Sequence, residues 1–212
     1  MFLMGTFLIV PIFSNENISV KTDKVFEYHN HDTYEVWYDS SVKNPAYVIW
    51  DFTNVDAIES EAVDNRKSSS FIKCGSSATQ SDFKNTGFDR GHMCPNNDRD
   101  WNADASKNTF RMCNVCPQSV SLNRGEWKSY EKKGHDLAHK YGLVTIMCGP
   151  IFEGTKNVIY IGKNNIRVPD KFFKIFYYDG KVECYLFSQD GSVIECSIRD
   201  IEKLIKAEII LK

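Results

Sequence analysis

The residues with the clearest chemical potential lie between positions 88 and 131. The run Asp89-Arg90-Gly91-His92 opens this segment, Asn114 and Asn123 follow, and Glu131 closes it. His92 could act as a general base, because a neutral imidazole with a pKa near 6.5 accepts a proton from water around neutral pH. A lone histidine is more often a structural or surface residue, so that alternative stays open at this point.

Two oxygen-bearing side chains in the segment could hold a hard cation. The amide oxygen of Asn123 could bind Mg²⁺, which keeps several waters when it has one or two protein ligands. Glu131 would lie roughly 12 Å further along a continuous helix, so it would contact a metal-bound water instead of the ion. Each residue also has a structural alternative, Asn123 as a helix cap bonded to the Glu126 amide and Glu131 as an i, i+4 partner of His135.

A neutral metal ligand suits a phosphodiester substrate. It leaves the double charge of the ion available to the developing phosphorane and to the departing oxygen. Arg90 and Arg66 could supply a guanidinium for a bidentate phosphate contact. For Arg90 the alternative is an ion pair with Asp89 or Asp98.

Strands and a helix are predicted around these residues. Residues 34–39 and 46–52 are rich in β-branched and aromatic residues, and the turn signal at 43–45 predicts a hairpin. Residues 53–86 are polar without a helical period, which predicts a long loop with room for one short element. Residues 124–141 have helical spacing, which predicts a helix that ends at Gly142.

The second half of the chain predicts a sheet and a final helix. Strand-like runs occupy residues 143–148, 158–161, 172–178 and 182–188, and we expect them to form one antiparallel sheet with the early hairpin. Ser197 and Asp200 resemble a capping pair, so we expect the chain to end in a helix. The predicted class is α+β, with a central antiparallel β-sheet flanked by helices.

Composition limits the classes of protein to which the chain can belong. Its 212 residues are 42% hydrophobic and 25% charged, with a net charge of −2, which excludes a disordered or collagenous chain. We expect a single domain over residues 21–212, with residues 1–20 as a signal or an N-terminal extension. The alternative for the apolar residues 2–13 is an N-terminal strand. The signal would imply a secreted or periplasmic protein, and we expect no membrane span in the mature form.

The motifs together resemble the DNA/RNA non-specific endonuclease family, the ββα-metal nucleases that include endonuclease G. The resemblance covers roughly residues 32 to 210. Its most specific parts are Asp89-Arg90-Gly91-His92, Asn114-x-x-Pro117-Gln118 and Leu122-Asn123-Arg124-Gly125-x-Trp127-x-x-x-Glu131.

The resemblance implies a Mg²⁺-dependent endonuclease with a ββα-metal active-site unit. The substrates would be DNA and RNA, single or double stranded, cleaved to 5′-phosphate and 3′-hydroxyl ends, with Mn²⁺ as a candidate substitute for Mg²⁺. His92 would deprotonate the attacking water, Asn123 would be the direct ligand of a largely hydrated ion, and Glu131 would hold a metal-bound water. A homodimer is left open.

The same resemblance assigns three further residues to the active site. Asn114 matches a position that supports the site, Arg90 belongs to the catalytic motif, and Arg66 is the candidate for the transition-state arginine. This chain has His135 where the family often has an arginine four residues after the glutamate, which puts that substrate contact in doubt.

Cysteines provide the main alternative. His92-x-Cys94 and Cys113-x-x-Cys116 have the ligand types and spacing of a Cys₃His zinc site, which predicts a zinc-stabilised, non-catalytic domain that binds nucleic acid or protein. The pattern is also similar to that of zinc nucleobase deaminases, but Cys94 stands where their proton-shuttling glutamate is needed. Within the nuclease interpretation, Cys113 and Cys116 are small buried residues. The seven cysteines are odd in number, so at least one thiol is unpaired within the chain.

The net charge gives no general attraction for nucleic acid. Binding would therefore depend on local charge, and residues 124–140 hold five basic against three acidic side chains, a balance of +2. We expect weak, salt-sensitive binding dominated by phosphate contacts.

Overall fold

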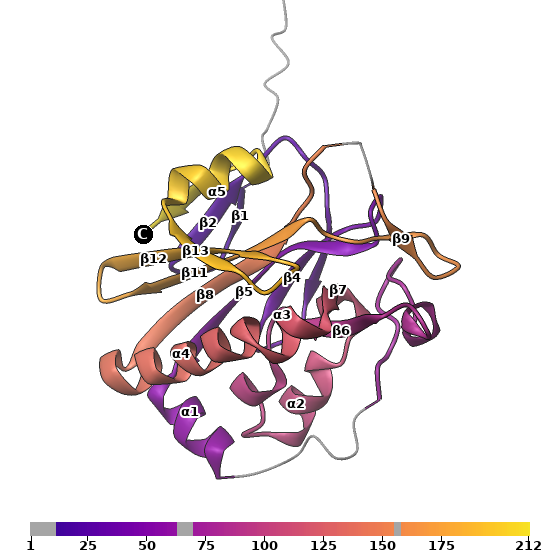
Figure 1. Ribbon diagram of the computed structural model, residues 1–212. Helices are drawn as coiled ribbons and strands as arrows, with labels where there is room; N and C mark the ends of the chain where they lie inside the picture. Colours follow the sequence, from indigo (N-terminus) through magenta and orange to yellow (C-terminus); the bar gives the residue numbers. More distant parts are fainter. Residues whose placement is uncertain (1–11, 63–69, 155–157) are drawn as a thin grey trace, which may run out of the picture.

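A seven-stranded antiparallel sheet forms the centre of the protein (Figure 1). The computed structural model describes residues 12–62, 70–154 and 158–212. The strand order is β13-β12-β11-β8-β5-β4-β3, and the strands are β3 (Glu27–Asn30), β4 (Glu35–Asp39), β5 (Asn44–Thr53), β8 (Leu143–Ile151), β11 (Lys171–Tyr178), β12 (Lys181–Ser188) and β13 (Val193–Cys196). The predicted α+β class with a central antiparallel sheet is confirmed.

Both faces of this sheet are buried. Successive residues of a strand point to opposite faces, so Trp50, Ile146 and Phe172 pack on one side while their neighbours Ile49, Met147 and Phe173 pack on the other. The first side is covered by α4 (Glu126–Tyr141) and α1 (Asn54–Glu61). The second is covered by α5 (Ile198–Ile205) and by a small sheet of β1 (Ile12–Ser14), β2 (Ile18–Lys21) and β14 (Glu208–Leu211). Figure 1 shows α4 and α5 on opposite sides of the central sheet.

Most predicted elements form where the sequence placed them. The early hairpin is β4 and β5, and the runs at 143–148, 172–178 and 182–188 are β8, β11 and β12. The helix predicted at 124–141 is α4, which ends at Gly142 with a positive φ of 85° that glycine tolerates. The run at 158–161 does not join this sheet, because β9 (Tyr160–Ile161) pairs only with β10 (Ile166–Arg167) in the described structure.

Two further expectations were wrong. The polar segment 53–86 contains α1 and a 3₁₀ helix, η2 (Gln80–Phe83), and α1 begins with a capping box between Thr53 and Asp56. The chain does not end in a helix, because Lys206 takes a left-handed conformation after α5 and the chain continues as β14. The capping pair of Ser197 and Asp200 at the start of α5 is present as expected.

The folded domain begins before residue 21. Ile18 and Val20 of β2 are fully buried, and β2 pairs with β14 from the end of the chain. The expected boundary therefore cuts through a strand of the domain. Most of the segment that resembles an export signal lies outside the described residues, so the signal stays a prediction. None of the helices in the described ranges has the length and apolar character needed to cross a bilayer.

A separate two-stranded ladder precedes α4 in the chain. It consists of β6 (Phe88–His92) and β7 (Val115–Ser119), with His92 opposite Val115 and Gly91 opposite Cys116. Between them lie η3 (Asn96–Asp98), α2 (Ala103–Thr109) and η4 (Met112–Asn114), and α3 (Val120–Arg124) follows β7. Gly91 is required here, since a Cβ at this position would lie 2.0 Å from Oε1 of the buried Gln118. Two strands followed by a helix are the predicted ββα unit.

Candidate active site

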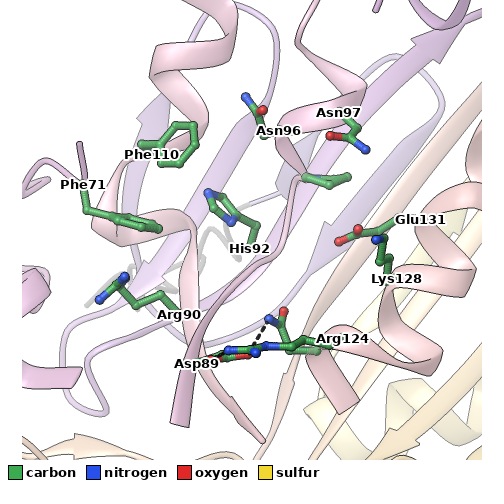
Figure 2. A pocket seen from close by; sticks show the side chains of 12 residues that line it. Phe71, Asp89, Arg90, His92, Asn96, Asn97, Phe110, Arg124, Lys128 and Glu131 are labelled. Carbon is green, nitrogen blue, oxygen red and sulfur yellow. Dashed lines mark hydrogen bonds and ion pairs between the residues drawn. The ribbon is translucent and has the colours of Figure 1, made fainter. Parts of the chain in front are cut away.

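A pocket of about 510 Å³ lies beside β6, α3 and α4 (Figure 2). Four of the residues selected from the sequence line it: His92, Arg90, Asn123 and Glu131. The remaining lining residues are Phe71, Asp89, Pro95, Asn96, Asn97, Phe110, Arg124 and Lys128. The fold therefore gathers side chains that are up to 60 positions apart in the sequence, from Phe71 to Glu131.

His92 is the last residue of β6 and projects into the pocket. Its ring packs against Phe71 and Phe110, with ring centroids 5.3 and 5.0 Å apart. Its backbone carbonyl accepts a hydrogen bond of 3.1 Å from Nε1 of the buried Trp127 in α4. Figure 2 shows the imidazole with the two phenylalanines on one side and Glu131 on the other. The imidazole is thus held by packing on one face and can act on a group in the pocket.

Asn123 is oriented by Asp89. The Asn123 Nδ2 donates to Asp89 Oδ2 at 3.0 Å, and Arg124 makes a two-pronged contact with the same carboxylate at 2.9 and 3.0 Å. The hydrogen bond from Arg124, followed by that from Asn123, lowers the pKa of Asp89, so this carboxyl is ionised at neutral pH. Because the amide nitrogen faces Asp89, the amide oxygen is on the opposite side of the group. The sequence alternative of a helix cap is wrong, since Gly125 caps α4 and Asn123 lies in α3.

Asn123 and Glu131 lie on different helices. The chain turns at Gly125, where a Cβ would lie 2.4 Å from the backbone oxygen of Ser121, and α4 begins afterwards. The estimate of 12 Å along one helix therefore does not apply. Both side chains line one pocket, and an amide oxygen with a carboxylate is a donor set that fits a hard, largely hydrated divalent cation.

Asn114 is buried behind the pocket. Its side chain is fully buried, accepts a hydrogen bond from the Cys94 backbone nitrogen at 2.9 Å, and donates to the Cys94 and Thr109 carbonyls at 2.9 Å each. Its backbone oxygen also accepts from Met93. Both polar atoms of the amide hold the backbone between His92 and Asn114, which fits the supporting position that the resemblance implies for this residue. Asn114 is a positioning residue.

Of the two arginines selected from the sequence, the structure describes only Arg90. Arg90 lines the pocket, and its Cζ lies 4.8 Å from the centre of the Phe71 ring. The ion pairs offered as its alternative do not form in the described structure, since Asp89 pairs with Arg124 and Asp98 with His135. Arg66 lies outside the described residues.

His135 takes part in a buried contact behind α4. Its Nε2 lies 3.1 Å from Oδ1 of Asp98, whose Oδ2 accepts from Trp50 Nε1 at 2.9 Å. Burial by itself lowers the pKa of His135. The hydrogen bond with Asp98 and the negative charge of that carboxylate raise this pKa by more than burial lowers it, so the net shift is upward. His135 therefore faces Asp98 and does not line the pocket. The main contact of His135 is thus with Asp98 and not with Glu131, the i, i+4 partner suggested from the sequence.

The Cys₃His zinc site is wrong. Cys113 forms a disulfide with Cys74, so its sulfur is not available as a thiolate ligand in this structure. Cys94 and Cys116 are free and fully buried, and burial raises the pKa of both thiols. The His92 ring packs on phenylalanines instead. Cys116 is a small buried residue, as the nuclease interpretation predicted.

Sequence reasoning missed several residues of the pocket. Asn96 and Asn97 follow the run Asp89-Arg90-Gly91-His92 and could have been suspected from that position, whereas Phe71 and Phe110 look like ordinary core residues. The charges predicted on α4 are also partly neutralised, because Lys132 pairs with Asp136 at 2.8 Å and Lys133 with Glu183 at 2.7 Å.

Comparison with known proteins gives a consistent result. The family model for DNA/RNA non-specific endonucleases matches residues 14–210. Mitochondrial endonuclease G of Homo sapiens is 33% identical over 132 residues, which cover 57% of this chain and 44% of that protein. Mitochondrial nuclease 1 of Schizosaccharomyces pombe is 34% identical over 161 residues, which cover 69% of this chain and 49% of that protein. The chain thus spans about half the length of the relatives it matches.

The fold comparison agrees with the sequence comparison. A chain in the crystal structure of the EndoG/EndoGI complex superposes with a TM-score of 0.79 at 23% identity, covering 87% of this chain and 86% of that one. At this identity the likeness establishes the shared fold. Because the family model matches nearly the whole sequence, the chain belongs to the DNA/RNA non-specific endonuclease family.

Proposed function

We propose that this nuclease is a divalent-metal-dependent endonuclease that hydrolyses phosphodiester bonds in both DNA and RNA. The observation that carries the proposal is the meeting of the His92 imidazole and the Asn123 amide in one pocket. Cleavage would leave 5′-phosphate and 3′-hydroxyl ends. The ion we propose is Mg²⁺, with Mn²⁺ as a substitute, because the donors are oxygens.

His92 would remove a proton from the attacking water. Its ring packs on one side against Phe71 and Phe110, which favours one orientation of the base toward the pocket. Arg90 lies beside the same pocket and would contact a non-bridging oxygen of the phosphate. A hydrated divalent ion on Asn123, with Glu131 contacting it through water, would stabilise the negative charge of the phosphorane and of the leaving 3′-oxygen.

The pocket offers phosphate contacts more than base contacts. Arg90 and Lys128 supply positive charge, and Asn96 and Asn97 supply amides. Contacts to phosphate carry little sequence information, which supports broad action on single-stranded and double-stranded substrates. Because binding would depend on phosphate contacts by cationic side chains such as Arg90 and Lys128, we expect it to weaken as salt rises.

Plasmid nicking tests this proposal. We expect Mg²⁺-dependent nicking of DNA and cleavage of RNA by the same preparation, both lost in EDTA and restored by excess Mg²⁺. His92→Ala should lower turnover by about 10²- to 10⁴-fold, the usual contribution of a general base, in a protein that still folds. His139→Ala, at an exposed histidine of α4 outside the pocket lining, is the matched control. Nicking by His92→Ala at the wild-type rate would overturn the assignment.

A further inference from the structure

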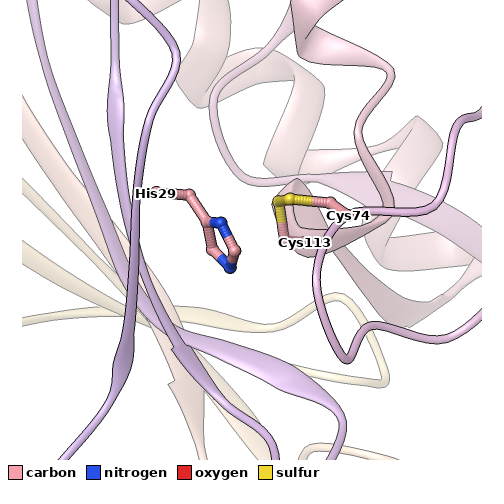
Figure 3. Close-up of side chains that lie close together, drawn as sticks. All are labelled: His29, Cys74 and Cys113. Carbon is pink, nitrogen blue, oxygen red and sulfur yellow. A yellow bond between two sulfur atoms is a disulfide. The ribbon is translucent and has the colours of Figure 1, made fainter.

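A second group of metal-ligating side chains lies away from the pocket. His29, Cys74 and Cys113 offer ligand atoms that all lie within 4.8 Å of one another. His31 extends the group, since its Nε2 lies 3.4 Å from Cys113 Sγ and 3.8 Å from Cys74 Sγ. Figure 3 shows the His29 ring pointing from its strand toward the disulfide of Cys74 and Cys113.

Three separate segments bring these residues together. His29 lies in β3, and His31 follows two positions later, so both side chains lie on the same side of the chain. Their rings are parallel, with an interplanar angle of 6° and centroids 6.1 Å apart. Cys74 comes from the segment before η2, and Cys113 lies in η4. Both cysteines are buried.

We propose that, when the Cys74–Cys113 disulfide is reduced, the two thiolates bind one Zn²⁺ together with His31 and His29. Two thiolates and two imidazoles are a common donor set for structural zinc. In a tetrahedral site with Zn–S of about 2.3 Å and Zn–N of about 2.0 Å, a nitrogen and a sulfur ligand lie about 3.5 Å apart. The two distances from His31 Nε2 to the sulfurs bracket this value.

The residues around the proposed ligands also suit a zinc site. Glu27 Oε2 lies 3.6 Å from His29 Nε2 and accepts a hydrogen bond from the Ser76 backbone nitrogen. A carboxylate beside one ring nitrogen is the usual way to orient an imidazole that binds zinc through the other. Gly75 makes room for this contact, because a Cβ there would lie 2.7 Å from the Glu27 carboxylate and 2.8 Å from the His29 ring.

The chemical change balances with a dithiol as reductant. The dithiol transfers two electrons and two protons to the S–S bond, which becomes two thiols, while the dithiol itself becomes a disulfide. Zn²⁺ then displaces the two thiol protons and binds the two thiolates and the two neutral imidazoles. The loaded site has no net charge, which suits its buried sulfurs.

The zinc site would hold together two segments that border the active-site pocket. The segment before Cys74 carries Phe71, which packs on His92, and Ile72 of that segment pairs with Arg111. Cys113 directly precedes the positioning residue Asn114. The disulfide holds these two segments together under oxidising conditions, and the zinc ion would hold them together under reducing conditions.

Metal titration of the full chain tests the proposal. The protein is reduced with dithiothreitol, freed of reductant without oxygen, and titrated with Zn²⁺ and with Co²⁺, whose charge-transfer absorption reports thiolate ligands. An Asn123→Ala background removes the pocket ligand, so that only the second site is counted. We expect one thiolate-bound ion per reduced chain and none in oxidised protein. Absence of the thiolate band in reduced, folded protein would overturn the proposal.

Variants identify the ligands. Cys74→Ser with Cys113→Ser should abolish the thiolate band, and His31→Ala should weaken Zn²⁺ binding more than the about 10- to 100-fold that loss of an outer partner costs. Glu27→Gln should cost about 10- to 100-fold and keep the band. Cys196→Ser, at the half-buried free cysteine of β13, is the matched control and should change nothing. A thiolate band that survives in the double cysteine variant would also overturn the proposal. If His31→Ala fails to fold, His29→Gln gives a second test of the histidine ligands.

Discussion

Asp89→Ala should weaken metal binding without removing any metal ligand. The Asp89 carboxylate accepts from Asn123 Nδ2 at 3.0 Å and from Arg124 at 2.9 and 3.0 Å. Alanine removes the acceptor that decides which side of the Asn123 amide faces the pocket. In the variant the amide can rotate, and its nitrogen can take the place of the oxygen that we expect to bind the ion.

The size of this effect follows from one charge-assisted hydrogen bond. Such a bond contributes about 1.5 to 3 kcal/mol, and each 1.4 kcal/mol is about a factor of ten in affinity. Asn123 is only partly buried, so solvent screening favours the lower half of that range. We therefore expect the Mg²⁺ concentration for half-maximal nicking to rise by about 10- to 50-fold, within the range seen for outer partners of metal ligands.

Nicking rates measured over a range of Mg²⁺ concentrations provide the assay. Asp89→Ala should approach the wild-type rate at saturating Mg²⁺, whereas Asn123→Ala should stay slow at every concentration. Asp136→Asn, which removes an exposed carboxylate paired with Lys132, is the control and should leave the curve unchanged. An Asp89→Ala curve that coincides with the wild-type curve would refute the orienting role.

Three other predictions concern stability. Asn114→Ala should lower the free energy of unfolding in urea by at least about 2 kcal/mol, because it leaves buried backbone groups unsatisfied at about 1 to 3 kcal/mol each, and a smaller loss would contradict its positioning role. The pKa of His135 is raised in the folded state, so its contribution is full below its unfolded pKa and is lost as pH rises through the folded pKa. Wild-type protein should therefore lose more stability than His135→Gln between pH 6 and pH 9, and equal losses would show that Asp98 does not hold the imidazolium. Reduction of the Cys74–Cys113 disulfide, whose sequence separation is 39, should cost about 4 kcal/mol in zinc-free denaturant titrations, and no change on reduction would exclude it as a tether.

Local patterns predicted the elements that depend on local physics. The alternation of buried strands, the turn residues of the hairpins and the Ser197 cap of α5 each act over a few residues, and they form where expected. The two misses have different causes, one local and one tertiary. The capping box at Thr53 was present in the sequence but lies in a polar context, and β14 is a strand because β2 is available to pair with it.

For the site, residue types and their spacing were enough to identify the chemistry of the side chains. His92, Asn123 and Glu131 were selected by residue type and by motif spacing, and they line one pocket. The side chains that surround them depend on how distant segments pack together. Phe71 packs on His92 from a segment whose Ile72 pairs with Arg111, a contact between residues far apart in the sequence.

The cysteines show the same division most clearly. Spacing grouped Cys113 with Cys116 and His92, whereas the fold placed it beside Cys74 and His31, which are 39 and 82 positions away in the sequence. Spacing reports only which residues are neighbours along the chain. A disulfide or a metal site depends on which atoms lie a few ångströms apart, and packing of the whole domain sets those distances.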